Sequence, residues 1–233
     1  MMESSPGKPL EPEGSHRYGI VLGVALAAVL FLIIAPESSW TRAIGLLFAG
    51  GMLLVVIATS RGNVRLRERA GIALIVGTFV LVTGTAFEWI PAPVGTAVSA
   101  ALILTTLVQL VRGLIVLLNT RGVTVQAVAG ALAVYLLLGI VFSFAITTMA
   151  KIDGGAYFAQ GTDGSESERV YYSFTSMTTT GFGDFTPAQR GGRAVAVLEM
   201  LIGQIYLVTI ISLLVGNLRR RREAADAASG NAP

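Results

Sequence analysis

The chain has 233 residues, of which 53% are hydrophobic and 13% are charged, and its net charge at neutral pH is +3. Because a soluble domain carries about 25% charged residues, this chain has too little polar surface to coat a water-soluble globule. It has no cysteine, which excludes disulfide frameworks and thiolate sites, and its single histidine excludes histidine-based triads and nearly every zinc cluster. We therefore expect an all-α membrane protein without enzyme activity, without a cofactor and without a nucleic-acid partner.

Six apolar stretches lie between the charged residues and the prolines of the chain. A helix needs roughly 20 mostly apolar residues to cross the hydrocarbon of a bilayer, and its backbone groups must be paired within the helix. A signal peptide is the alternative for the first stretch, but this stretch is long for that role and lacks a short basic leader. The six predicted transmembrane helices are residues 18–35, 41–59, 71–90, 94–118, 123–150 and 194–218.

Basic residues lie mainly on one side of these six spans. That side carries eleven of the 17 lysines and arginines, or twelve if Arg112 reaches toward it. Because lysine and arginine accumulate on the cytoplasmic side, both termini are predicted to be cytoplasmic. Two lysines against 15 arginines are typical of a bacterium with a GC-rich genome, so we expect a bacterial cell-membrane protein. The other side carries Arg42, Lys151, Arg169, Arg190 and Arg193.

This orientation predicts four regions. Residues 1–17 form a disordered cytoplasmic tail, residues 18–122 a four-helix peripheral domain, residues 123–218 a pore-type domain, and residues 219–233 a basic and then disordered tail. The loop from Lys151 to Arg169 faces outward and contains more acidic than basic residues. Two interpretations of the loop stay open: an acidic vestibule that concentrates cations, or a loop that is acidic only because it is soluble.

Between the last two spans lies a segment that suits neither a span nor a surface loop. It reads YYSFTSMTTTGFGDFTP over residues 171–187, which is too short and polar to cross a membrane but too apolar for an exposed loop. A re-entrant element fits both properties. Ser165 and Glu168 form a capping-box pattern, which predicts a short helix that runs to about Thr178. The negative end of that helix would point into the membrane, where a cation most needs compensation.

The residues after this helix are suited to carry carbonyl groups that point in one direction. An ordinary strand alternates its carbonyls, whereas left-handed residues interspersed with normal ones align them. Gly181 and Gly183 permit such conformations without a Cβ clash. The Thr179 hydroxyl adds a further oxygen atom at the inner end. The pattern predicts a row of oxygen atoms that can replace the water shell of an ion.

The segment resembles the potassium channel pore family, whose filter reads TVGYG in each of four loops. The resemblance implies a homotetramer with the conduction path on its axis, with permeant potassium as the bound ion. It implies that Asp184 lies at the outer mouth, and that Tyr171 and Tyr172 form an aromatic collar that supports the filter. The implied filter residues are Thr179, Thr180, Gly181, Phe182 and Gly183.

Three residues depart from the pattern of that family. Thr180 stands where valine is usual, and Phe182 replaces a tyrosine whose hydroxyl can bond to the collar. Thr175 occupies a site that is a carboxylate in some members, so we expect no proton shared with Asp184. These departures keep a poorly selective cation channel open as an alternative.

The last span contains the other candidate residues. Gly203 is either a hinge, as the resemblance implies, or a small residue for close helix packing. Glu199 is an acid deep in the membrane, and we predict a hydrogen bond to Thr175 or Ser176 that braces the filter; direct ion binding is the alternative. By the resemblance, the residues that face the cavity and the gate are Gln204, Leu207, Ile211, Ser212 and Val215.

Gating by voltage or by a ligand-binding domain is not expected. The fourth span offers only Arg112, whereas a voltage sensor moves several arginines. The 15 residues after Leu218 are too few for a ligand-binding domain, and Arg219 to Arg222 are interpreted as an anchor to lipid headgroups, with a lipid-controlled gate as the alternative. We therefore predict a voltage-insensitive, potassium-selective channel. A non-conducting accessory or scaffold subunit is a further alternative, and whether a regulatory subunit binds is left open.

Overall fold

The computed structural model describes residues 17–59, 64–152, 155–217, 219–220 and 223. These residues are helical apart from short connections and one isolated bridge between Phe158 and Pro187. Most of the predicted tails and Leu218 lie outside the described residues; of the tails, the structure describes Arg17, Arg219, Arg220 and Glu223. The helices are α1 (Arg17–Ile34), α2 (Ser39–Thr59), α3 (Val64–Ala86), α4 (Ala92–Arg121), α5 (Val125–Ile152), α6 (Glu166–Met177), α7 (Arg190–Ile205) and the π-helix η1 (Tyr206–Ile211).

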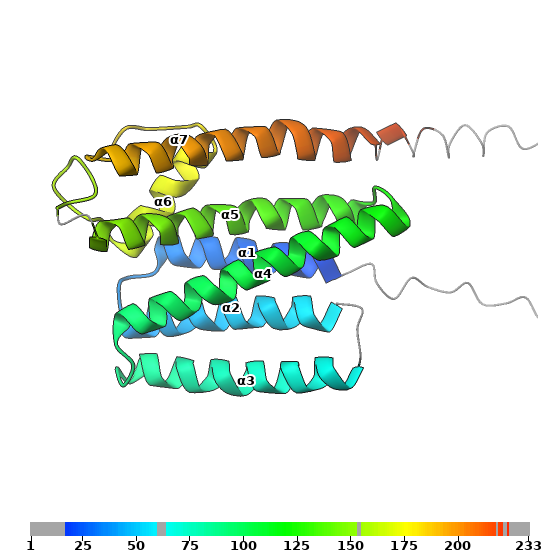
Figure 1. The fold of residues 1–233 in the computed structure, drawn as a ribbon, viewed down its shortest axis with the longest axis horizontal. Coiled ribbons are helices and arrows are strands. Elements are labelled where there is room, and N and C mark those ends of the chain that lie inside the picture. The colour runs from blue at the N-terminus through cyan, green and yellow to red at the C-terminus, as the bar shows by residue number, and fades with distance from the viewer. Residues whose placement is uncertain (1–16, 60–63, 153–154, 218, 221–222, 224–233) are drawn as a thin grey trace, which may run out of the picture.

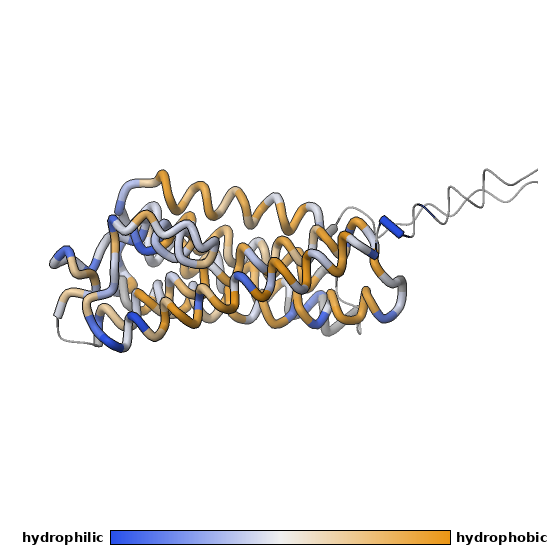
Figure 2. The backbone as a smooth tube through the Cα atoms, turned by 90° about the horizontal axis from the view of Figure 1, so that it is seen from above, coloured by the Kyte–Doolittle hydropathy of each residue, from blue (hydrophilic) through white to orange (hydrophobic). Residues whose placement is uncertain are grey.

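The long helices run side by side along one axis (Figure 1). α3 lies at one edge of the bundle and α7 at the opposite edge, while the short α6 lies between α7 and α5 at one end. α1 begins at the opposite end from α6, which is also where the helix that continues from η1 ends. Figure 2 shows that apolar residues cover most of the length of these helices and that most of the hydrophilic residues lie near their ends. This distribution is that of a membrane protein.

Four helices have the length and composition needed to cross a membrane: Ser39–Ile57, Val94–Thr120, Val125–Lys151 and Arg190–Asn217. Two further apolar helices, Tyr18–Ile34 and Gly71–Ala86, are shorter. The structure therefore supports an all-helical membrane protein, and the count of six spans stays a prediction.

The third helix shows the largest difference between predicted and observed bounds. The prediction began at residue 71, whereas α3 begins at Val64 with the charged sequence VRLRERA. Arginine, leucine and glutamate are strong helix formers, so the helix extends beyond its apolar part. At its other end α3 stops at Ala86 rather than at Ile90, and Glu88 in the following turn has a left-handed φ of 60°. Hydropathy therefore located the membrane-compatible part of the helix and not its ends.

The largest apolar core joins helices that the sequence assigned to different domains. It combines buried residues of α1, α2 and α4 with Ala133, Val134, Leu137 and Ile140 of α5. The predicted boundary at residue 122 therefore does not separate two cores among the described residues. Because α5 is packed on both sides, the position of α6 is tied to the first four helices as well as to α7.

Exposed aromatic rings mark the end of the bundle where α2 begins and α3 ends. The Phe87 ring lies 6.1 Å from that of Trp40 and 5.9 Å from that of Trp89. All three side chains are exposed. Tryptophan is enriched where a helix leaves the hydrocarbon for the headgroups, so this cluster is suited to that interface.

Candidate functional site

The capping box predicted from the sequence is present at the start of α6. The Ser165 hydroxyl accepts a hydrogen bond from the Glu168 amide at 3.1 Å, and the Glu168 carboxylate accepts one from the Ser165 amide at 2.7 Å. Two of the N–H groups left unpaired at a helix start are thereby satisfied. The predicted helix is confirmed, and it ends at Met177 with Thr178 as its C-cap.

The first four helices also hold the start of α6, through the turn between α1 and α2. The Glu166 amide donates to the Glu37 carboxylate at 2.7 Å, and the Ser167 hydroxyl donates to the Ile33 carbonyl at 2.6 Å. The sequence carries no signal for these contacts, since more than 120 residues separate the partners.

Removal of the cap should weaken α6 measurably. We expect Ser165→Ala to lower the free energy of unfolding by about 1 kcal/mol, because one helix N–H loses its partner. The measurement is thermal unfolding of the purified protein in detergent. Ser99→Ala is the matched control, since the Ser99 hydroxyl bonds to the Gly95 carbonyl within the same helix, α4. An equal loss in both variants would contradict a specific role for the cap.

Arg169 closes the loop that precedes α6. Its guanidinium donates to the Asp163 carbonyl at 3.2 Å and to the Gly164 carbonyl. Burial lowers the pKa of Arg169, and the carboxylates of Glu166, Glu37, Asp163 and Glu168 act in the opposite direction. The outer loop is thus a folded structure, and its proposed role as a vestibule stays a prediction.

The TTTGFGD segment, Thr178 to Asp184, has the alternating backbone that the sequence predicted. Gly181 and Gly183 have φ values of 51° and 82°, so both are left-handed. Thr179 is left-handed as well, with a φ of 58°, and this position was not foreseen. The left-handed region is unusual for a β-branched residue. The Thr179 amide donates to the Ser176 carbonyl at 2.9 Å, a bond that holds this conformation.

Two carbonyl groups of the segment point away from α6. The amides of Thr180 and Gly181 both donate to the Thr175 carbonyl, at 2.9 and 3.1 Å. In a trans peptide the C=O points opposite to the N–H, and no described peptide bond is cis. The carbonyls of Thr179 and Thr180 are therefore directed to the same side, away from the packed helix. All residues of the segment are exposed in the single chain.

Tyr171 lies against the outer part of this segment. Its ring stacks on that of Phe182 with centroids 6.3 Å apart and an angle of 5° between the planes. Its hydroxyl also bonds to the Asp184 carboxylate, which raises the pKa of Tyr171 because the acceptor favours the protonated phenol. Tyr171 thus lies against the segment, and its role as a support of the filter stays a prediction.

Tyr172 has different neighbours from those predicted. It is buried with Phe158, at 5.2 Å between ring centroids, and with Tyr157, at 6.5 Å. Successive residues of a helix point about 100° apart, so Tyr171 and Tyr172 cannot both face the segment. Tyr172 instead packs α6 against the outer loop, which pairs with the chain after the segment through the Ala159 amide and the Thr186 carbonyl at 2.8 Å.

Gly203 of α7 packs directly against the C-terminal end of α6. A Cβ atom at Gly203 would overlap the carbonyl oxygen of Met177 and lie 2.5 Å from its Cγ. The Tyr135 hydroxyl of α5 donates to the same Met177 carbonyl at 3.4 Å. The structure gives Gly203 the packing role that the sequence left open, while a hinge at this residue stays a prediction.

The predicted hydrogen-bond partner of Glu199 was wrong in detail. Glu199 bonds to a hydroxyl of α6, but that hydroxyl belongs to Ser173 and not to Thr175 or Ser176. The Thr175 hydroxyl donates to the Tyr172 carbonyl at 3.0 Å. Ser173 and Met177 are four residues apart and share the face of α6 toward α7, whereas Thr175 is two positions away from either.

The face that α7 presents to the cavity also needs correction. Ile211 packs inside the protomer, against a cluster of Leu114, Ala127, Ala131 and Leu214. Ile211 is the last residue of η1, and a π-helix has a wider turn than an α-helix, so its position around the helix differs from the one expected for a regular α-helix. Of the predicted cavity residues, Gln204, Ser212 and Val215 are exposed, and Leu207 is half-buried.

The π-helix begins at a residue that is tied to α5. The Tyr206 hydroxyl donates to the Ala131 carbonyl at 2.8 Å, and its ring stacks on that of Tyr135 at 5.9 Å. No proline or glycine lies within Tyr206–Ile211, so the sequence offered no signal for this irregularity. In the described part of the chain, no three His, Cys, Asp or Glu side chains are grouped closely enough to hold a metal ion.

The part of the chain that contains this site is similar to a known protein family. Residues 130–220 match the model of the Ion_trans_2 family, whose description is ion channel. No curated protein and no solved structure matches the chain. The matched residues include α6, the TTTGFGD segment and α7, and the match points to an ion channel and not to an enzyme.

Proposed function

We propose that the protein is a voltage-insensitive, potassium-selective channel of the cell membrane, in which four copies surround one conduction path. In this proposal α6 is the pore helix and the TTTGFGD segment is the selectivity filter. The chain crosses the membrane six times, and both of its termini lie in the cytoplasm. Membrane lipids and further copies of the chain are its partners. Potassium passes through the filter as a substrate and not as a cofactor.

One observation carries the proposal: the aligned backbone of the filter. Left-handed residues alternate at Thr179, Gly181 and Gly183, and the amides of Thr180 and Gly181 share one acceptor on the pore helix. The oxygen atoms that result face away from the protein core. Carbonyl oxygens in such a row can substitute for the hydration shell of a monovalent cation.

The exposed surfaces of the single chain favour a tetramer. One chain supplies only one wall of a filter, and Phe182 in that wall is 69% exposed. The last helical stretch, from α7 through η1 to Asn217, is apolar and exposed outside its packed face, with Leu201, Ile205, Val208 and Leu213 all more than half exposed. Such a surface is suited to the neighbouring copies and to lipid. α4 contains only Arg112 and, as its last residue, Arg121, and this small number of arginines supports voltage insensitivity.

Replacement of a filter glycine should remove selectivity. In Gly183→Asp an L-residue must adopt a φ of 82°, which costs about 1–2 kcal/mol, and a carboxylate is added beside the ion path. We expect the ratio of potassium to sodium flux in liposomes to fall toward one. The measurement is tracer or fluorescence flux in opposed potassium and sodium gradients.

Gly155→Asp is the matched control, because it adds the same charge at an exposed position of the outer loop. Unchanged discrimination in Gly183→Asp would count against the assigned filter. Equal potassium and sodium permeability of the wild-type protein would favour the poorly selective channel. Wild-type protein that conducts nothing under varied pH, tension and lipid would favour the accessory or scaffold subunit.

A further inference from the structure

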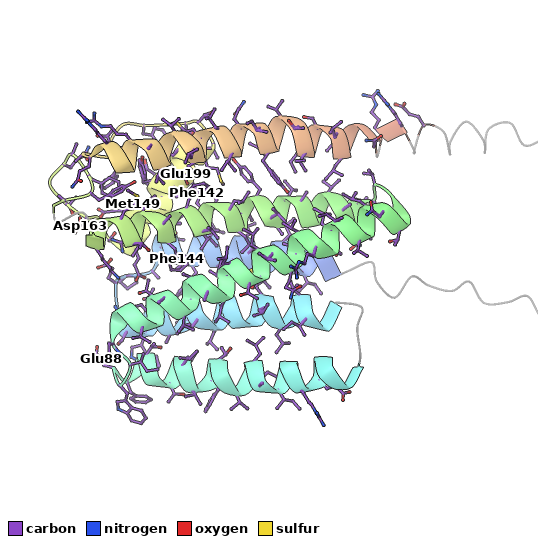
Figure 3. All side chains as sticks on the ribbon, in the orientation of Figure 1. Glu88, Phe142, Phe144, Met149, Asp163 and Glu199 are labelled. Carbon is purple, nitrogen blue, oxygen red and sulfur yellow. The ribbon has the colours of Figure 1, made fainter. Side chains whose placement is uncertain are left out.

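The packed face of α7 contains one carboxyl group among small residues. Its buried residues are Gly192, Ala196, Glu199 and Gly203, and the Glu199 side chain is 0% exposed. Figure 3 shows Glu199 on the side of α7 that faces α6 and α5. The glycines and the alanine let the helices approach closely, whereas an acid is not needed for close packing. Its presence calls for a chemical explanation.

A count of protons at Ser173 identifies the charge state of Glu199. The Ser173 hydroxyl oxygen lies 2.7 Å from the Gly139 carbonyl oxygen, and it also contacts Oε1 of Glu199. A hydroxyl has one proton to donate, and a carbonyl has none. The Ser173 proton can serve the contact with Glu199 or the contact with Gly139, but not both. A carboxylate supplies no second proton, whereas a neutral acid can donate to Ser173 while Ser173 donates to Gly139, so only the neutral acid satisfies both contacts.

Apart from the Ser173 hydroxyl, no described group donates a hydrogen bond to Glu199 that could stabilise a negative charge. Its second oxygen, Oε2, is buried and has no hydrogen-bond partner in the described part of the chain. Burial of an ionised carboxylate oxygen without a partner costs much more free energy than burial of the neutral acid. The only ion pair among the described residues joins Arg219 and Glu223.

The titratable groups near Glu199 are phenols. They are Tyr135 of α5, Tyr172 of α6 and, stacked on Tyr135, Tyr206 at the start of η1. None of these groups is a cation at neutral pH.

The charged residues on the same elements lie toward the outer end of the bundle. Arg193 is six residues from Glu199, about 9 Å along the helix, and its side chain donates to the Pro187 carbonyl. The others are Arg190 on α7, Lys151 at the end of α5, and Glu166, Glu168 and Arg169 in the first turn of α6.

We propose that Glu199 is a neutral acid whose proton holds α7, α6 and α5 together, and that conduction depends on this proton. This inference rests on the proposed function. Glu199 is a positioning residue that acts through Ser173, and Ser173 lies one helical turn before Met177, the last residue of the pore helix. Ionisation removes one of the two protons, so the Ser173 hydroxyl can donate to Glu199 or to Gly139 but not to both. The contact that is left without a proton brings two acceptors together, so the pore helix moves and the filter loses its geometry.

The direction of the pH dependence follows from the protonation state of Glu199 that fits the fold. The fold selects the protonated acid, so its contribution is complete at low pH and is lost as pH rises. Once most of the carboxyl groups are ionised, the protonated fraction falls about tenfold per pH unit. Conduction should therefore decrease steeply on the alkaline side.

The test compares potassium flux through the full-length protein in liposomes over a range of pH. Wild-type flux should fall about tenfold per pH unit at its alkaline limit. E199Q should keep its flux there, because the amide nitrogen donates to Ser173 at every pH. E88Q is the matched control, since Glu88 is exposed at the distant turn after α3, and it should behave as the wild type. An alkaline loss in E199Q equal to that of the wild type would overturn the inference.

Infrared spectroscopy gives a second readout that does not depend on conduction. A protonated carboxyl has a C=O stretching band that an ionised carboxylate lacks. The band should be present at neutral pH in the wild type and in E88Q, and absent in E199Q. If E199Q does not fold, the wild type alone is followed as the pH is raised, and its flux should be lost over the same pH range as its infrared band. Wild-type flux that persists at a pH where the band has disappeared overturns the inference. If the wild-type protein shows the band but conducts at no pH, the proposed channel function is wrong, whereas the assignment of Glu199 as a neutral acid still holds.

Discussion

Replacement of Gly203 by alanine is expected to abolish conduction and to lower the free energy of unfolding by about 1–3 kcal/mol. The added methyl group would overlap the Met177 carbonyl oxygen, which belongs to the backbone and cannot rotate away. Either α7 or the end of α6 must therefore shift, and the TTTGFGD segment begins at the next residue. Thermal unfolding in detergent and potassium flux in liposomes measure the two effects.

Gly51→Ala is the matched control for this substitution. Gly51 lies within α2, and a Cβ atom there has no neighbour within 4 Å. Alanine in a helix interior should stabilise the protein by roughly 0.5–1 kcal/mol, so the two variants should change stability in opposite directions. The comparison also decides between the two roles of Gly203. If Gly203 acts only as a hinge, its replacement by alanine should leave the free energy of unfolding unchanged and slow the opening of the channel. That result would contradict the packing role.

Gly139→Val should have the next largest effect, through the contact between α5 and α6. A Cβ atom at Gly139 would lie 2.7 to 3.0 Å from three carbon atoms of the Phe174 ring. The carbonyl of the same residue accepts the hydrogen bond from Ser173, so displacement of α6 also breaks the chain of bonds to Glu199. We expect a loss of about 1–3 kcal/mol in stability and at least partial loss of flux.

Gly77→Val tests whether valine itself is the cause. Gly77 lies in the middle of α3, with no atom within 4 Å of its Cβ position, and α3 lies at the edge of the bundle opposite α7 (Figure 1). The control should keep the flux and nearly all of the stability of the wild type. Normal flux in Gly139→Val would mean that the Phe174 ring can move aside, and that close contact of α5 with α6 is not needed.

Local sequence was sufficient where the interacting residues are neighbours in the chain. Ser165 and Glu168 are three residues apart, so the start of α6 could be predicted from residue types alone. The left-handed positions of Gly181 and Gly183 follow from the absence of a side chain. Thr179 adopts the same conformation against its own preference, because hydrogen bonds from the end of α6 hold it there. That position could not be predicted from propensity.

Composition and hydropathy by themselves indicated a helical membrane protein, and the residues from Ser165 to Gly183 predicted a short helix followed by left-handed glycines. Both properties depend on residue type and on short spacings, which a sequence displays directly. Only the tertiary structure decided that Glu199 pairs with Ser173, that Glu37 holds the start of α6, and that η1 turns Ile211 away from the exposed face. These contacts depend on the crossing angles between helices that are distant in sequence and on the rotation of each helix about its own axis. Because apolar residues lie on nearly every face of each helix, the sequence pattern does not show which face packs against a neighbour.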